Sequence, residues 1–175
     1  MTVENRRSFR LPSNTRFILS NGKAVYTGKA TNISLGGAFI HMLNFEGIRN
    51  GDKLKCEFML QENAAIMSAN VFVKRVAFGT DNPSDLSGLG LAFTEFFGDT
   101  RRELTEFMLD QKRIYELMGT LLTNTEPDLR SIRPLLAKLP VSRLYDLRDL
   151  KVFIEGTLRA IQMVESGHGD SPSVT

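Results

Sequence analysis

The hydrophobic residues of this 175-residue chain follow one period in the first half and another in the second half. Between residues 16 and about 97, apolar and polar residues alternate in short runs. The run from Lys53 to Leu60 places Leu54, Cys56, Phe58 and Leu60 on one side and mostly charged residues on the other. An alternation with a period of two is typical of a half-buried strand. This half is therefore predicted to form five or six short strands.

Two further segments and one turn extend this β pattern. Residues 65–77 place alternate apolar residues on one face, and residues 88–93 alternate larger apolar residues with small ones. Asn21-Gly22, between two apolar runs, is a signal for a hairpin with a two-residue loop. Because the strands follow one another with little helix between them, we predict a small antiparallel β-barrel.

After Gly98 the apolar residues are three and four positions apart, which predicts amphipathic helices. We expect a helix over residues 99–123, with Asp99 and Thr100 offering an N-cap. A shorter helix over 127–138, with a kink or restart at Pro134, and a third over 141–166 complete the pattern. The fold class is thus α+β: an antiparallel barrel followed by a helical C-terminal extension. The composition of residues 167–175 indicates a flexible tail.

The apolar faces of the two long helices need partners, because helices in proteins gain most of their stability by burying such a face. Three partners fit the pattern: the other helix, the barrel, or a second copy of the chain. A helical hairpin on the barrel is the simplest of these arrangements. A homodimer through residues 100–166 is therefore one of the arrangements that we consider.

Positive charge is concentrated at the N-terminal end, although the net charge is only +2. The first 30 residues hold six basic residues and one acidic residue, whereas residues 100–175 are balanced. This excess would attract an anionic ligand, but a solvated basic arm explains it as well. The excess is too small to favour a nucleic acid polymer as the partner.

The remaining composition indicates a cytoplasmic protein that is not an enzyme. The lone Cys56 excludes an internal disulfide and fits a reducing compartment. The chain has no run of about 20 apolar residues, so we expect no membrane insertion. The histidines are His41 and His168, and neither belongs to a catalytic set or to a zinc, calcium or phosphate-loop motif. We expect neither a metal nor a cofactor, and we expect Cys56 to be a small core residue.

Two short motifs carry the candidate chemistry. Arg6 and Arg10 have R-x-x-x-R spacing with Arg7 beside the first, and residues 32–37 read N-x-S-x-x-G. A guanidinium matches the O6 and N7 acceptors of guanine, pairs bidentately with phosphate and stacks on a base. In the second motif, Asn32 and Ser34 offer short donors and acceptors, while Gly36 and Gly37 permit close approach of a ligand to the backbone. A tight turn between strands would explain the second motif alone.

Together with Gly90-Leu91-Ala92-Phe93, the two motifs resemble the PilZ domain family over roughly residues 4–98. The resemblance implies a receptor for cyclic di-GMP in which Arg6 and Arg10 hold guanine and phosphate groups. It further implies that Asn32, Ser34 and Gly37 contact the other guanine, with Arg7 and Gly36 as additional members of the site. By this reading, residues 1–15 are a mobile ligand-binding arm, 16–98 the barrel, and 99–166 a helical extension that the minimal domain lacks.

Two functions follow from these patterns. In the first, cyclic di-GMP folds the arm onto the barrel and the change is relayed to a protein partner. Family analogy leaves motility and biofilm pathways open for that partner. In the second, the chain is a structural or oligomerisation module whose helices bind a protein without nucleotide. The presence of both motifs favours the first.

Overall fold

The computed structural model describes residues 8–61, 64–79, 86–123, 129–139 and 146–166. The chain divides into two compact units. One comprises Pro12–Met108, and the other joins the residues up to Leu11 with Leu109–Thr175. The helix α1 (Thr100–Thr123) begins in the first unit and ends in the second.

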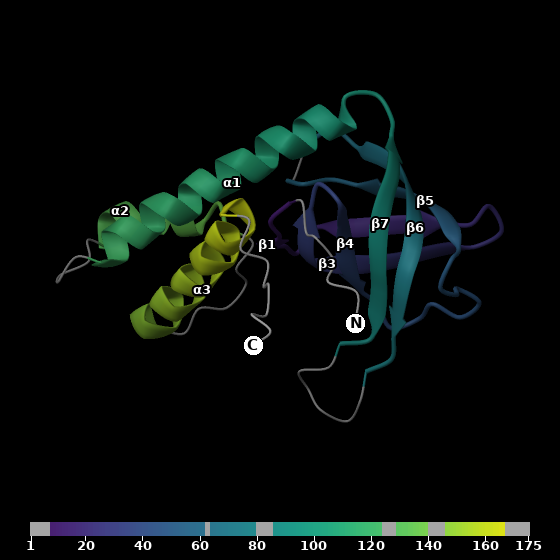
Figure 1. Ribbon diagram of the computed structural model, residues 1–175, viewed down its shortest axis with the longest axis horizontal. Coiled ribbons are helices and arrows are strands. Elements are labelled where there is room, and N and C mark those ends of the chain that lie inside the picture. The colour runs from purple at the N-terminus through teal and green to yellow at the C-terminus, as the bar shows by residue number, and fades with distance from the viewer. Residues whose placement is uncertain (1–7, 62–63, 80–85, 124–128, 140–145, 167–175) are drawn as a thin grey trace, which may run out of the picture. The chain divides into compact units, whose positions relative to one another are not determined.

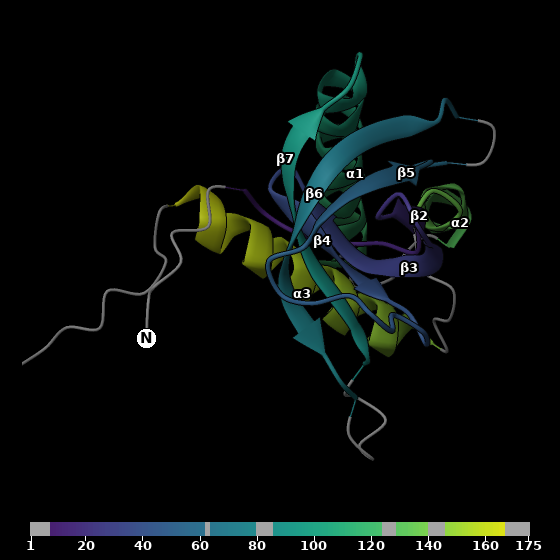
Figure 2. The same ribbon diagram turned by 90° about the vertical axis from the view of Figure 1, so that its right-hand side faces the viewer.

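The strands form a closed antiparallel barrel (Figures 1 and 2). The sheet order is β1-β3-β2-β5-β6-β7-β4, and an additional pairing of β3 with β4 closes a ring of six strands. The short β1 lies outside that ring, next to β3. This architecture, with helices after the barrel, confirms the α+β fold that the sequence predicts. The bounds of the strands are β1 Leu11–Pro12, β2 Arg16–Ser20, β3 Val25–Ser34, β4 Gly37–His41, β5 Lys53–Phe58, β6 Met67–Ala77 and β7 Gly88–Phe96.

The interior of the barrel is filled by the alternate apolar residues of its strands. Leu19, Cys56 and Ala69 face one another on β2, β5 and β6, and all three are fully buried. The rings of Phe17 and Phe58 stack with centroids 4.6 Å apart. Burial raises the pKa of the Cys56 thiol to about 12, because the thiolate would lose its hydration. Cys56 is therefore a core residue, as predicted.

The turn between β2 and β3 is a hairpin, but its loop differs from the predicted one. The strand register ends at Ser20 and Val25, so the loop has the four residues 21–24 and not two. The side-chain oxygen of Asn21 accepts hydrogen bonds from the backbone N–H groups of Lys23 and Ala24. Gly22 has a φ of +84°. The Asn side chain thus organises a wider turn than the Asn-Gly pair alone suggests.

The first two turns of α1 belong to the barrel unit. The hydroxyl of Thr100 accepts a hydrogen bond of 3.2 Å from the backbone N–H of Ser68 on β6. Thr100 therefore ties the helix to a strand, and the predicted helix start is correct to within one residue. Leu104 and Met108, one and two turns later, are buried.

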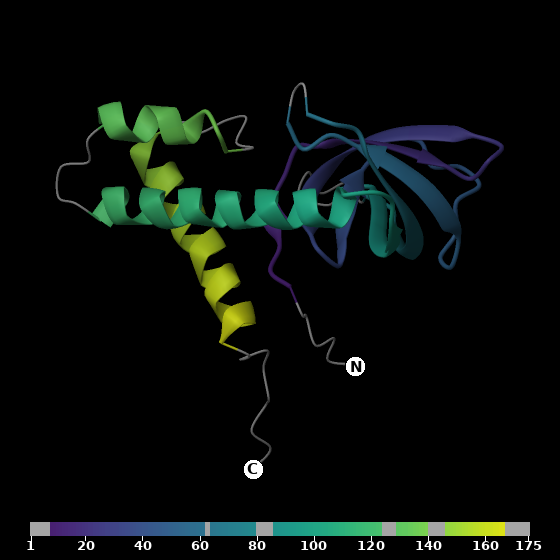
Figure 3. The same ribbon diagram turned by 90° about the horizontal axis from the view of Figure 1, so that it is seen from above.

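The second unit contains the rest of α1, α2 (Leu129–Leu136) and α3 (Leu147–Glu165) (Figure 3). Tyr115 of α1 packs against Phe153 of α3 with ring centroids 6.1 Å apart. Gly119 permits close approach of these helices, because a Cβ at this position would lie 2.6 Å from Leu158. The two long helices thus pack on each other, which is one of the three arrangements that the sequence left open.

The ends of α1 and α3, at Thr123 and Glu165, agree with the predicted ends to within one residue, and α2 ends two residues before the predicted end. The expected starts of the second and third helices, at residues 127 and 141, lie outside the described residues. The third helix was predicted too long, however, because Asp146 has an extended backbone and α3 begins only at Leu147. Asp146 caps α3 by accepting a hydrogen bond from the backbone N–H of Asp149. Pro134 lies inside α2. Within the described residues, no helix has the length and apolar character needed to cross a membrane.

Candidate functional site

The N-x-S-x-x-G motif forms the hairpin that joins β3 to β4. Ser34 and Gly37 are paired across a two-residue loop, and the Ser34 hydroxyl donates a 3.1 Å hydrogen bond to the carbonyl of Gly37. A Cβ on Gly37 would overlap the carbonyl oxygen of Leu91 on β7. The N–H of Phe93 donates to the carbonyl of Gly36 at 3.1 Å. The motif therefore fixes this hairpin against β7.

A β-bulge on β3 sets the direction of the Asn32 side chain. Ala30 pairs with Ile40 and Asn32 with Phe39, so one extra residue of β3 lies between these pairs. Ala30 and Ile33 both face the core, and Asn32 consequently faces outward. Bulges commonly re-aim a side chain in this way next to functional sites. The Asn32 side-chain oxygen is buried and has no hydrogen-bond partner among the described residues.

A second bulge lies on β6, on the other side of β4 and β7. Val73 pairs with Leu91 and Arg75 with Gly90, which leaves Lys74 as the extra residue. Val73 is buried, whereas Lys74 and Arg75 are both exposed. The bulge thus presents two consecutive cations on the outside of the barrel.

The two bulges are connected by one row of paired residues, which we call the bulge row: Asn32, Phe39, Gly90 and Arg75. Paired residues of neighbouring strands point to the same face. In this row, the guanidinium carbon of Arg75 lies 5.4 Å from the centroid of the Phe39 ring. It reaches Phe39 across Gly90, which has no side chain. The barrel therefore carries an arginine–aromatic pair beside Asn32.

The structure places the predicted site residues in two groups. Asn32, Ser34, Gly36 and Gly37 lie together at the β3–β4 hairpin of the barrel unit. Arg10 is exposed and belongs to the second unit. Arg6 and Arg7 lie outside the described residues. Phe39 and Arg75 were not among the predicted residues, because their positions in the bulge row depend on two register shifts.

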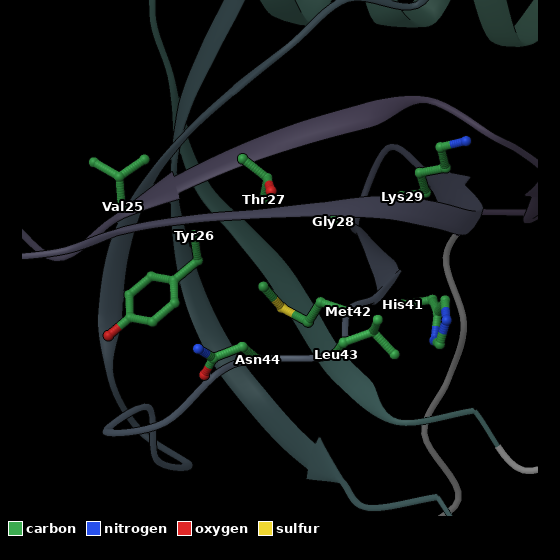
Figure 4. A pocket seen from close by; sticks show the side chains of 9 residues that line it. All are labelled: Val25, Tyr26, Thr27, Gly28, Lys29, His41, Met42, Leu43 and Asn44. Atoms are coloured by element: carbon green, nitrogen blue, oxygen red, sulfur yellow. The ribbon is translucent and has the colours of Figure 1, made fainter.

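An open groove of about 510 Å³ lies elsewhere on the barrel, between the first half of β3 and the residues at and after the end of β4 (Figure 4). His41 at its edge is partly exposed and makes a 2.8 Å hydrogen bond with the carbonyl of Ser87. The site residues Asn32, Ser34, Gly36 and Gly37 are not part of its lining. The groove is lined by Val25, Tyr26, Thr27, Gly28, Lys29, His41, Met42, Leu43 and Asn44.

Comparison with known families identifies the class of protein that this barrel and motif define. The model of the PilZ domain matches residues 4–110, which is more than half of the chain. The chain therefore belongs to the PilZ domain family. No curated protein matches it.

Among solved structures, the inhibitor of motility MotI/DgrA of Bacillus subtilis is similar, with a TM-score of 0.53 and 16% identity. The match covers 62% of this chain and 51% of that protein, so the chain spans about half of its length. YcgR of Escherichia coli in complex with c-di-GMP has a TM-score of 0.49 and 14% identity, over 62% of this chain and 46% of that one. The MrkH–c-di-GMP complex of K. pneumonia has a TM-score of 0.49 and 21% identity, over 60% and 50%. At these identities, the likeness to MotI/DgrA establishes the fold.

Proposed function

We propose that this chain is a receptor for cyclic di-GMP that acts by binding and not by catalysis. The ligand-binding residues would be Arg6, Arg7 and Arg10 from the N-terminal segment and Asn32, Ser34, Gly36 and Gly37 from the β3–β4 hairpin. Membership of the PilZ domain family and the presence of both motifs support this assignment.

The observation that carries the proposal is the unsatisfied side-chain oxygen of Asn32. A buried acceptor without a partner costs about 1–3 kcal/mol. Asn32 faces outward at the bulge, so a small rotation of its side chain would offer this oxygen to a ligand. Guanine carries N–H donors, among them its exocyclic amino group. A guanine of cyclic di-GMP would thus provide the partner that Asn32 lacks.

Ser34 and the two glycines would act differently from Asn32. The Ser34 hydroxyl proton is already used in the hydrogen bond to Gly37, so its oxygen remains available only as an acceptor. It would therefore receive an N–H from the ligand. Gly36 is exposed in the loop, and the absence of a side chain leaves its backbone accessible to a base or phosphate.

The arginines would supply charge and planar hydrogen bonding. Arg6 and Arg10 would pair with phosphate and the Hoogsteen edge of guanine, and Arg7 would add a further contact or raise the local potential. In this account, residues 1–15 form an arm that closes on ligand, 16–98 the receptor barrel, and 99–166 the extension. The ligand shifts the equilibrium between the open and the closed arm only by as much as it binds the closed state more tightly than the open one. A cytoplasmic protein partner would recognise the change in the arm's conformation.

Calorimetric titration with cyclic di-GMP tests the receptor assignment. Arg10→Ala should weaken binding at least tenfold, since a hydrogen bond to a charged group typically contributes about 1.5–3 kcal/mol. Lys23→Ala is the matched control, because it removes one positive charge from the β2–β3 loop, at the other end of β3 from Ser34. The control should bind like the wild type. Absence of binding by the wild-type protein would refute the proposal.

A second candidate function is homodimerisation through residues 100–166. Four large apolar residues of α1 and α3 are 46–64% exposed in the single chain: Leu109, Leu117, Val152 and Met163. Sedimentation of the wild type and of Leu117→Glu and Val152→Glu tests this role. A dimer that the substitutions dissociate would support it, and a wild-type monomer at all concentrations would exclude it.

A further inference from the structure

We infer that Arg75, supported by Phe39, is a further ligand contact on which a guanine base of cyclic di-GMP stacks. This inference rests on the proposed function and extends it to residues outside both motifs. It concerns the outer face of β4, β6 and β7, next to the β3–β4 hairpin.

The position of the Arg75 guanidinium supports this contact. Arg75 belongs to β6, but its guanidinium lies over the ring of Phe39 on β4. Phe39 is the direct pairing partner of Asn32. Neighbouring strands are roughly 5 Å apart, so the guanidinium lies about one strand spacing from the strand that carries Asn32. One base can therefore reach Asn32 with its edge and Arg75 with its face.

The Arg75 side chain is exposed, and none of the ion pairs between described residues involves it. The Phe39 ring lies beside the guanidinium, 5.4 Å from its carbon, and the rest of this exposed side chain would be accessible to a base. An arginine plane held in this way is pre-organised for stacking, because less side-chain freedom is lost on binding.

A purely structural explanation of the pair is the covering of Gly90. An aromatic side chain next to a strand glycine can shield the exposed backbone, and Arg75 crosses Gly90 to reach Phe39. A lysine would cover the glycine almost as well, since its aliphatic stem is similar. It would not provide a flat delocalised surface for a base. Substitution by lysine therefore separates the two roles.

Titrations of cyclic di-GMP into Arg75→Ala, Arg75→Lys and Phe39→Leu test the inference. Both Arg75 variants should bind at least about fivefold more weakly than the wild type, the lower end of the effect of losing one base stack. Phe39→Leu should weaken binding to a smaller extent, because Arg75 remains but loses its support. Lys74→Ala is the matched control, since it removes the neighbouring charge, which lies over the separate ring of Phe72. The control should change the affinity less than twofold.

The outcomes distinguish this inference from the receptor assignment. If Arg75→Ala binds like the wild type while Arg10→Ala is weakened, the receptor stands and the Arg75 contact is refuted. If Arg75→Lys retains full affinity, or Lys74→Ala loses as much as Arg75→Ala, charge and not stacking is responsible and the inference fails. If the wild type does not bind, the receptor assignment fails and the Arg75 contact fails with it. Thermal unfolding without ligand should show the variants folded, with midpoints close to the wild type.

Discussion

The hydroxyl of Ser34 donates a 3.1 Å hydrogen bond to the carbonyl oxygen of Gly37, across the two-residue loop between β3 and β4. Both residues belong to the motif that we propose as part of the binding site for cyclic di-GMP. The bond shapes the loop. In the proposed site it would also position the Ser34 oxygen for the ligand, so folding and binding would be coupled at this position.

Replacing Ser34 by Ala should lower both stability and affinity. The loss of one buried hydrogen bond costs about 1 kcal/mol of unfolding free energy. Urea denaturation measures this loss, and calorimetry on the same variant measures the loss of affinity. A variant with an unchanged urea midpoint would show that the hydrogen bond does not hold the loop.

Substitution of two glycines by Ala should have opposite effects on stability. Gly37→Ala would drive a Cβ into the Leu91 carbonyl, which is backbone and cannot turn aside. Overpacking of this kind typically costs about 1–3 kcal/mol. Gly156→Ala, in the middle of α3, meets no atom within 4 Å and should stabilise the helix by up to about 1 kcal/mol. Denaturant unfolding of both variants tests the pair, and equal shifts in one direction would contradict this account.

The buried thiol of Cys56 should make stability depend on pH above pH 9. Its pKa is raised from 9.0 to about 12 in the folded chain, so the unfolded chain loses the proton first. The protonated thiol therefore contributes fully to the free energy of unfolding below pH 9. This contribution falls as the pH rises toward 12, by at most about 1.4 kcal/mol per pH unit. The stability difference between the wild type and Cys56→Ala should therefore shrink above pH 9. A difference that stays constant from pH 7 to 10.5 would refute the prediction.

The hydroxyl of Tyr115 is a buried polar group in the helical unit. It has no hydrogen-bond partner among the described residues, and burial raises its pKa. Tyr115→Phe removes the unsatisfied group and keeps the ring contact with Phe153. The variant should be at least as stable as the wild type, by up to about 1–3 kcal/mol, which is the cost of a buried unpaired polar group. A clear loss of stability would indicate that the hydroxyl has a partner.

The barrel could be predicted from the sequence because its signals are local. The alternation around Cys56 gives the inward face of β5, and the apolar spacing after Gly98 gives the extent of α1. The loop at Asn21 could not be predicted in detail, because its length depends on hydrogen bonds made by one side chain.

The candidate site was predictable only where it forms a contiguous motif. Asn32, Ser34, Gly36 and Gly37 are close in sequence and form one hairpin. Phe39 and Arg75 are distant in sequence, and Arg75 pairs with Gly90 in the row of Phe39 only because the bulge on β6 adds one residue. The bulge on β3 brings Asn32 into the same row. The adjacent cations Lys74 and Arg75 at the end of an apolar run were the visible signal for the second bulge.

The most direct test of the central claim is an NMR titration of ¹⁵N-labelled wild-type protein with cyclic di-GMP. We expect the largest shifts at the Asn32 side-chain amide and at the backbone amides of Ser34, Gly36 and Gly37. The β2–β3 loop, residues 21–24, should remain unchanged and serves as an internal control. Absence of shifts at excess ligand, or shifts that spare the β3–β4 hairpin, would contradict the assignment of this chain as a cyclic di-GMP receptor.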